Sequence, residues 1–269
     1  MQNITKKFVV YSLITIIVFI LLFPVLWAIL SSFKELKDIV VTPPKFIFQP
    51  IIDNYLTVFA REGIRSGLIN SAVVCASALT LGIFFGVPSA YAIARNSGRL
   101  KQHLQFFVLS LRFLPPIAII VPFMGLWLDF GLYDSYIALI TTYLLISISV
   151  IIWMSISPFE RVPSECIEAA KIDGASYMQV FFKVSLPIAL PNLVGGFSFT
   201  FILLWNELLL ALALTSQKAT LPVAVSAIAK MGMELPWGVV NAAAVTLMLP
   251  PLALLGLLTR SMSRAFYIS

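Results

Sequence analysis

Residues 8–30 read FVVYSLITIIVFILLFPVLWAIL, an unbroken run of uncharged and mostly apolar side chains. As a helix, a run of this length crosses the ~30 Å hydrocarbon core of a bilayer. A secretory signal peptide has a shorter apolar core and a small-residue cleavage site, whereas SSFKELKD follows this run. We therefore predict an uncleaved first transmembrane helix, with Lys6 and Lys7 on its cytoplasmic side.

The whole chain shares this apolar character. Of its 269 residues, 60% are hydrophobic and 11% are charged. Soluble domains have roughly 45–50% and about 25%, respectively. Disorder is excluded as well, because it requires low hydrophobicity and high charge. The composition predicts a polytopic membrane protein in contact with lipid.

The charged and rare residues exclude several function classes. The formal net charge is +6, but the 18 Lys and Arg residues are scattered. Since nucleic-acid binding needs a basic patch or stripe, we expect no nucleic-acid partner. Cys75 and Cys166 lie in different kinds of segment, and His103 is the one histidine. We therefore expect no disulfide framework and no metal or catalytic site built on these residue types.

Five further apolar segments predict five more transmembrane helices. Their bounds are 67–94, 103–128, 133–154, 186–213 and 239–259. Pro115, Pro116 and Pro122 lie inside the third span, where they should kink or break the helix. The expected fold class is all-α: a polytopic membrane helical bundle with six transmembrane helices, in which residues 1–269 form a single transmembrane domain.

The distribution of Lys and Arg predicts the orientation. With the N-terminus inside, the inner segments hold ten Lys and Arg residues and the longer outer segments hold seven. The outer loop at 129–132 has no basic residue. Because basic residues concentrate in cytoplasmic loops, we predict an N-in/C-in, multi-pass protein of the cytoplasmic membrane.

Residues 161–187, RVPSECIEAAKIDGASYMQVFFKVSLP, form a polar segment between two spans. Ser164 is a favourable N-cap for a first helix, and Gly174 can adopt the left-handed conformation that ends one. A second helical run is expected at 176–185, before Pro187. The pattern predicts a helix, a sharp turn and a second helix on the cytoplasmic surface.

Small and acidic residues on the first of these helices favour contact with another protein. Ala169 and Ala170 give it a face without bulk, which lets a partner approach the backbone closely. Glu168 and Asp173 could pair with basic groups of that partner. The alternative is an amphipathic loop that lies on lipid headgroups.

The stretch IEAAKIDGASYMQVFFKVSLPIALP, residues 167–191, resembles the EAA motif of ABC importer permeases. Further segments resemble the carbohydrate-uptake, maltose-type branch of that family, in the same order along the chain. They are SSFK at 31–34, NYLTVF at 54–59, SAYAIAR at 89–95, FILLWNELLLAL at 201–212 and PWGVVNAAAV at 236–245. One departure is the C-terminal LTRSMSRAFYIS, which lacks the glycines of the maltose-type tail that reaches into the ATPase.

The resemblance implies a transmembrane permease subunit of an ATP-driven, binding-protein-dependent importer of a sugar or sugar-like solute, working by alternating access. The implied partners are a homologous second permease, a nucleotide-binding ATPase dimer and a periplasmic or tethered solute-binding protein. This chain has no Gly-rich phosphate-binding loop, so it should hold no cofactor and perform no enzymatic reaction. ATP and Mg²⁺ would bind to the partner ATPase.

The implied coupling residues lie in 161–187, the cytoplasmic coupling loop. They are Glu168, Ala169, Ala170, Asp173 and Gly174.

Three polar or aromatic residues in the fifth predicted span could line a solute path. Trp205 and Asn206 could stack on and hydrogen-bond a sugar, and Glu207 is an ionisable group in an apolar span. Equally, Glu207 could be a structural carboxylate bonded to a helix end. Trp205 and Asn206 could instead anchor the helix and bond to its neighbours.

The predicted outer loop at 214–238 is long and partly apolar, which invites a partner surface. In maltose-type permeases the corresponding loop enters the binding protein's cleft. The resemblance therefore implies contacts from Lys218, Leu221 and Lys230. The alternative is a re-entrant or interfacial helix that caps the bundle.

Two other function classes fit the sequence less well. A stand-alone secondary transporter or channel would have an internal inverted repeat and more intramembrane charges. An intramembrane enzyme would have a histidine cluster, a nucleophile elbow or paired aspartates.

Overall fold

The computed structural model describes residues 2–113, 115–228 and 236–266, and these contain helices and no strand. The all-α prediction is confirmed. The chain divides into two compact units, one of residues 1–65 and 224–249 and the other of residues 66–223 and 250–269. The site considered below lies in the second unit.

The first unit begins with α1 (Gln2–Ser32), followed by α2 (Leu36–Val40) and α3 (Asp53–Ala60). Val9–Ser32 has a mean hydropathy of 3.0, and none of its most apolar window is buried inside the chain. The first predicted span is therefore confirmed by length and composition. Since the helix cannot expose this surface to water, lipid or other protein surface must cover it.

A group of polar contacts holds the loop that follows α1. The Asn54 amide donates to the carbonyls of Ser32 and Lys34, at 2.9 Å each. The buried Lys34 ammonium donates to the Lys45 carbonyl at 2.6 Å and lies 4.5 Å from the centre of the Trp27 ring. These contacts satisfy carbonyls at the helix end and bring the SSFK and NYLTVF segments together.

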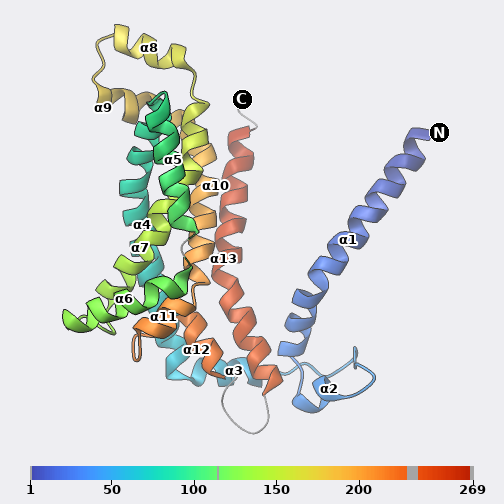
Figure 1. The fold of residues 1–269 in the computed structure, drawn as a ribbon. Coiled ribbons are helices and arrows are strands. Elements are labelled where there is room, and N and C mark those ends of the chain that lie inside the picture. The colour runs from blue at the N-terminus through green and yellow to red at the C-terminus, as the bar shows by residue number, and fades with distance from the viewer. Residues whose placement is uncertain (1, 114, 229–235, 267–269) are drawn as a thin grey trace. The chain divides into compact units, whose positions relative to one another are not determined.

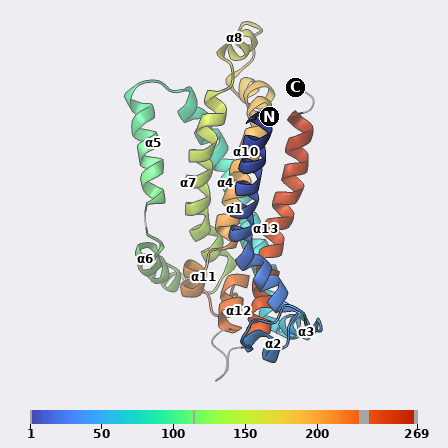
Figure 2. The same cartoon turned by 90° about the vertical axis from the view of Figure 1, so that its right-hand side faces the viewer.

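The second unit holds the rest of the bundle (Figure 1). Its helices in chain order are α4 (Glu62–Arg95), α5 (Arg99–Arg112), α6 (Pro116–Asp129), α7 (Tyr136–Glu160), α8 (Ser164–Ile172), α9 (Tyr177–Gln179), η1 (Val180–Ser185), α10 (Leu186–Trp205) and α11 (Leu209–Leu214). The remaining helices, α12 (Leu221–Ile228) and α13 (Trp237–Phe266), belong in part to each unit. The helix α4 is also divided, because residues 62–65 lie in the first unit. Within the second unit, α8 and α9 lie at one end, and α6 and α11 lie at the other (Figures 1 and 2).

Five described helices are long and apolar enough to span a membrane, and six spans result if α5 and α6 count as one. The third predicted span is broken, because α5 and α6 meet at 80°. Pro115 is extended, with φ −65° and ψ 134°, and Pro116 opens α6. A residue before proline is pushed out of the helical region, so the adjacent prolines break the helix here.

Small residues allow α4 and α7 to pack closely. A Cβ atom on Gly82 would overlap the Ser147 hydroxyl, and one on Gly86 would lie 2.9 Å from Ile151 Cγ2. The Gly-, Ala- and Ser-rich composition of the second span thus brings two backbones together.

Candidate functional site

The coupling loop folds as helix, turn and helix. The first helix, α8, ends with Gly174 in the left-handed conformation at φ +80°. The Gly174 N–H donates to the Lys171 carbonyl at 3.0 Å, and the Ala175 N–H donates to the Ala170 carbonyl at 2.9 Å. The predicted role of Gly174 as a helix terminator is confirmed. The predicted N-cap was one residue off, because Pro163 occupies that position and Ser164 is the first helical residue.

The second helix begins with a capping box that the sequence analysis missed. The Ser176 hydroxyl accepts from the Gln179 N–H at 3.4 Å, and the Gln179 side chain accepts from the Ser176 N–H at 2.8 Å. The Ser-x-x-Gln spacing is the signal for it. The prediction that this helix stops before Pro187 was wrong. The π-helix η1 leads directly into α10, and Pro187 is the second residue of α10.

The two faces of α8 have different surroundings. Ile167 is buried and Ala170 is partly buried against the same apolar core, which includes Val162 and Val180. Ala170 was expected on the open face, but it lies three residues after Ile167 and therefore faces inward with it. The outward residues are Glu168, Ala169, Asp173 and Gly174, all of which are exposed.

An apolar patch surrounds the Gly174 turn, and the sequence analysis did not single it out. Ile172 is 85% exposed, Tyr177 84% and Met178 65%. The signal that could have indicated this patch is the presence of apolar residues in an otherwise polar segment. Large apolar side chains grouped on a protein surface mark interaction sites.

The end of α7, which precedes α8 in the chain, is held by contacts with α4 and α5. The Arg95 guanidinium donates to the Phe159 carbonyl at 2.8 Å, and Lys101 pairs with Glu160 at 2.8 Å. The Tyr91 ring lies 5.3 Å from that of Phe159 and 5.0 Å from that of Phe181. Basic groups are favourable at a helix C-terminus, so the end of α7 is held by α4 and α5.

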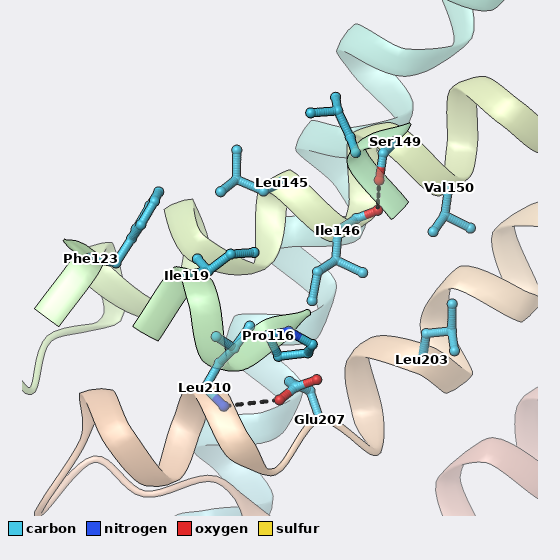
Figure 3. Close-up of a pocket in the computed structure, with 11 residues that line it drawn as sticks. Pro116, Ile119, Phe123, Leu145, Ile146, Ser149, Val150, Leu203, Glu207 and Leu210 are labelled. Atoms are coloured by element: carbon cyan, nitrogen blue, oxygen red, sulfur yellow. Dashed lines mark hydrogen bonds between the residues drawn. The ribbon is translucent and has the colours of Figure 1, made fainter. Parts of the chain in front are cut away.

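A cavity of about 410 Å³ opens between the broken span, α7 and α10 (Figure 3). Its walls are mainly apolar. The lining residues are Leu111, Pro116, Ile119, Phe123, Leu145, Ile146, Ser149, Val150, Leu203, Glu207 and Leu210. Glu207 is the one ionisable residue in this lining. In the part of the chain that the structure describes, no group of three His, Cys, Asp or Glu residues could hold a metal ion.

The three candidate solute-path residues fall at a helix break, because the fifth span ends at Trp205 and not at 213. One oxygen of Glu207, Oε1, accepts from the Leu210 N–H at 2.9 Å and so caps the first turn of α11. Trp205 is 3% exposed, and the Asn206 amide donates to the Ile202 carbonyl at 2.8 Å. Of the three, Glu207 borders the cavity.

Within the predicted outer loop at 214–238, residues 221–228 form the helix α12. Leu221 is fully buried, so this conformation does not offer its side chain to a partner. The Lys218 ammonium lies 4.7 Å from the centre of the Tyr136 ring. Lys230 lies outside the described residues.

Comparison with known proteins identifies the chain's relatives. The chain is 36% identical over 240 residues to the probable ABC transporter permease protein y4oR of Sinorhizobium fredii, covering 88% of this chain and 86% of that protein. It is 34% identical over 242 residues to the trehalose transport system permease protein SugB of Mycobacterium tuberculosis, covering 88% and 87%. It is 31% identical over 232 residues to the sulfoquinovosyl glycerol transport system permease protein SmoH of Agrobacterium fabrum, covering 85% and 81%.

A solved structure shares the fold. A chain of a bacterial ABC transporter involved in the import of the acidic polysaccharide alginate superimposes with a TM-score of 0.76 at 20% identity, covering 96% of this chain and 97% of that one. The family model for the binding-protein-dependent transport system inner membrane component matches residues 78–267. This protein therefore belongs to the family of binding-protein-dependent transport system inner membrane components, the permease subunits of ABC transporters.

Proposed function

We propose that the chain is a permease subunit of an ATP-driven, binding-protein-dependent importer for a sugar or sugar-like solute. The relatives named for trehalose and sulfoquinovosyl glycerol support this solute class. The observation that carries the proposal is α8, a helix that lies at one end of the second unit and ends in an exposed turn at Gly174.

This helix and turn are the contact for a separate ATPase dimer, which binds ATP and Mg²⁺. Glu168, Ala169, Asp173 and Gly174 present charge and backbone outward, and the apolar patch of Ile172, Tyr177 and Met178 lies beside them. Ala170 contributes from the other side, by letting α8 pack closely on the bundle. Closure of the ATPase dimer would move α8 and drive alternating access.

The charge distribution supports an N-in/C-in orientation in the inner membrane. Within residues 66–223, the helix termini and turns at the α8 end carry six basic residues: Arg95, Arg99, Lys101, Arg161, Lys171 and Lys183. In the same residues, Lys218 is the basic residue at the opposite end, and Arg112 is the last residue of α5, at the break between α5 and α6. An excess of basic residues marks the cytoplasmic side, so α8 lies in the cytoplasm, where the ATPase is.

Two further partners complete the importer. The uncovered apolar surface of α1 supports a homologous second permease beside this one, with lipid on the remaining faces. A periplasmic or tethered solute-binding protein meets the outer loop at 214–238. Because Lys218 and Leu221 are held against the bundle, they position the loop, and contact falls to the residues beyond them, including Lys230.

The cavity beside Glu207 is part of the solute path in this subunit. It lies between two interrupted helices, the α5–α6 break and the α10–α11 break, and such breaks form solute sites in other transporters. Its apolar walls allow passage without tight binding. Trp205 and Asn206 support the break and do not line the cavity.

The test is purification of the tagged chain from native membranes, followed by identification of the proteins that accompany it. We expect an ATPase and a second permease, and ATP hydrolysis by this complex should rise when solute-loaded binding protein is added. A chain that purifies alone and transports solute in response to an ion gradient would instead be a secondary transporter.

A further inference from the structure

Asp134 binds the backbone of the outer loop at the end of the second unit opposite α8. It precedes α7 in the left-handed conformation, at φ +58°, and its N–H donates to the Leu214 carbonyl at 3.2 Å. Its carboxylate Oδ1 accepts from the N–H groups of Ser216 and Lys218 at 2.9 Å each, and Oδ2 accepts from the Gln217 N–H at 3.0 Å. One side chain therefore binds three consecutive residues of the outer loop.

The same stretch of loop is tied to α4. The Asn70 amide donates to the Ala219 carbonyl at 2.8 Å, and its oxygen accepts from the Tyr136 hydroxyl at 2.7 Å. The Ser71 hydroxyl accepts from the Leu221 N–H at 2.8 Å. Residues 214–221 are thus fixed to the starts of α4 and α7, and this part of the loop cannot shift without breaking several hydrogen bonds.

The electrostatics of Asp134 agree with this geometry. Partial burial alone would raise the pKa of its carboxyl group, but the three backbone N–H donors and the nearby Lys218 ammonium outweigh that effect and lower the pKa. The group is therefore ionised at neutral pH, and hydrogen bonds to an ionised acceptor are stronger than those to a neutral one.

The helix that follows Asp134 reaches the opposite end of the unit. The Ser135 hydroxyl accepts from the Ala138 N–H at 3.1 Å as the N-cap of α7, which continues without a break to Glu160. There, Lys101 and Arg95 hold its last residues beside α8. A helix fastened at both ends passes a displacement of one end to the other.

We propose that Asp134 is a positioning residue that locks the outer loop to α7, so that a partner pushing on this loop from outside moves the end of α7 that carries α8. The inference rests on the proposed function, because it needs an outer partner and an ATPase.

Two variants of Asp134 separate the carboxylate from its backbone conformation. Asp134→Gly keeps φ +58° accessible and removes all the acceptors. Asp134→Asn also tolerates this conformation, but it loses the charge and places an amide donor among N–H donors. The matched control is Asp129→Asn, because Asp129 is exposed at the same end and its carboxylate makes no hydrogen bond or ion pair among the described residues.

The first measurement is hydrogen exchange of the amides of residues 216–218 in the intact complex in nanodiscs. In Asp134→Gly, these amides should exchange at least about tenfold faster, because each loses a hydrogen bond to a charged group. The control should match the unmodified protein. Unchanged exchange in both Asp134 variants would show that Asp134 does not hold the loop.

The second measurement is ATP hydrolysis by the complex as a function of the concentration of solute-loaded binding protein. The Asp134 variants should keep the basal rate, whereas the maximal stimulated rate should fall toward it. A higher half-saturating concentration with a full maximal rate would mean that Asp134 only shapes a docking surface, and would overturn the transmission role. If the unmodified complex shows no stimulation, the proposed function fails, and so does the proposed transmission through α7. The hydrogen-exchange experiment still decides whether Asp134 holds the loop.

Discussion

Replacement of Gly174 by proline tests the link between α8 and ATP hydrolysis. Gly174 has φ +80°, whereas proline fixes φ near −65°, so the turn cannot keep its course. Proline also removes the N–H that bonds to the Lys171 carbonyl at 3.0 Å, a loss of about 0.5–1.5 kcal/mol. No atom outside the turn lies within 4 Å of a Cβ placed on Gly174, so the change acts on the backbone of the turn itself.

Two further substitutions at Gly174 should disturb the turn less than proline does. Gly174→Ala has room for its methyl group but should cost roughly 1–2 kcal/mol of left-handed strain, which shifts the turn toward other conformations by about five- to thirtyfold. Gly174→Asn should be milder, because asparagine tolerates this conformation, and it serves as the matched control.

The assay compares membrane insertion, uptake and binding-protein-stimulated ATP hydrolysis across the three variants. All should insert normally, since the turn lies outside the spans. Activity should decrease from Asn to Ala to Pro. Full uptake by Gly174→Pro would refute the claim that the turn orients a coupling helix.

Three further changes probe the rest of the second unit. Gly82→Leu should prevent α4 from packing closely on α7, because overpacking costs about 1–3 kcal/mol or more. The yield of folded complex in size-exclusion chromatography should therefore fall. The control is Gly195→Ala, which has open space around its Cβ and should be recovered at the normal yield. Arg95→Leu leaves the Phe159 carbonyl without its charged donor, which should lower the free energy of unfolding by about 1.5–3 kcal/mol. Thermal unfolding of the complex should therefore begin at a lower temperature. An unshifted unfolding curve would argue against this contact. Glu207→Leu removes the cap on α11 and should destabilise this helix by about 1 kcal/mol, whereas Glu207→Gln retains an acceptor. If the Gln variant has normal stability but altered uptake, the carboxylate faces the solute. If its uptake is normal, Glu207 serves only to cap α11.

The transmembrane architecture was largely predictable, because each span satisfies a simple length and hydropathy requirement. The α8 turn was also predictable, since Gly174 supplies the backbone freedom that the turn needs. In these cases local sequence alone determines the structure.

The predictions that failed depended on distant contacts or on fine backbone chemistry. Ala170 faces inward because Ile167 anchors α8 in the core, and composition does not show which face is anchored. The fifth span stops at Trp205 although apolar residues continue beyond it, because the Glu207 carboxylate starts a new helix.

The contact between Asp134 and residues 216–218 joins parts of the chain more than 80 positions apart. No periodicity in the sequence signals a contact of this kind. It became visible only once the start of α7 and the outer loop were placed side by side.

Cys166 offers the most direct test of the central claim that α8 contacts an ATPase. The chain has two cysteines; Cys166 is exposed on α8, and Cys75 is buried. A thiol-reactive photo-crosslinker added to inside-out membrane vesicles should attach to Cys166, and illumination should join the chain to a protein that mass spectrometry identifies as the nucleotide-binding ATPase. Attachment to Cys166 from the outside of intact cells, or a photoproduct with lipid alone, would contradict the account.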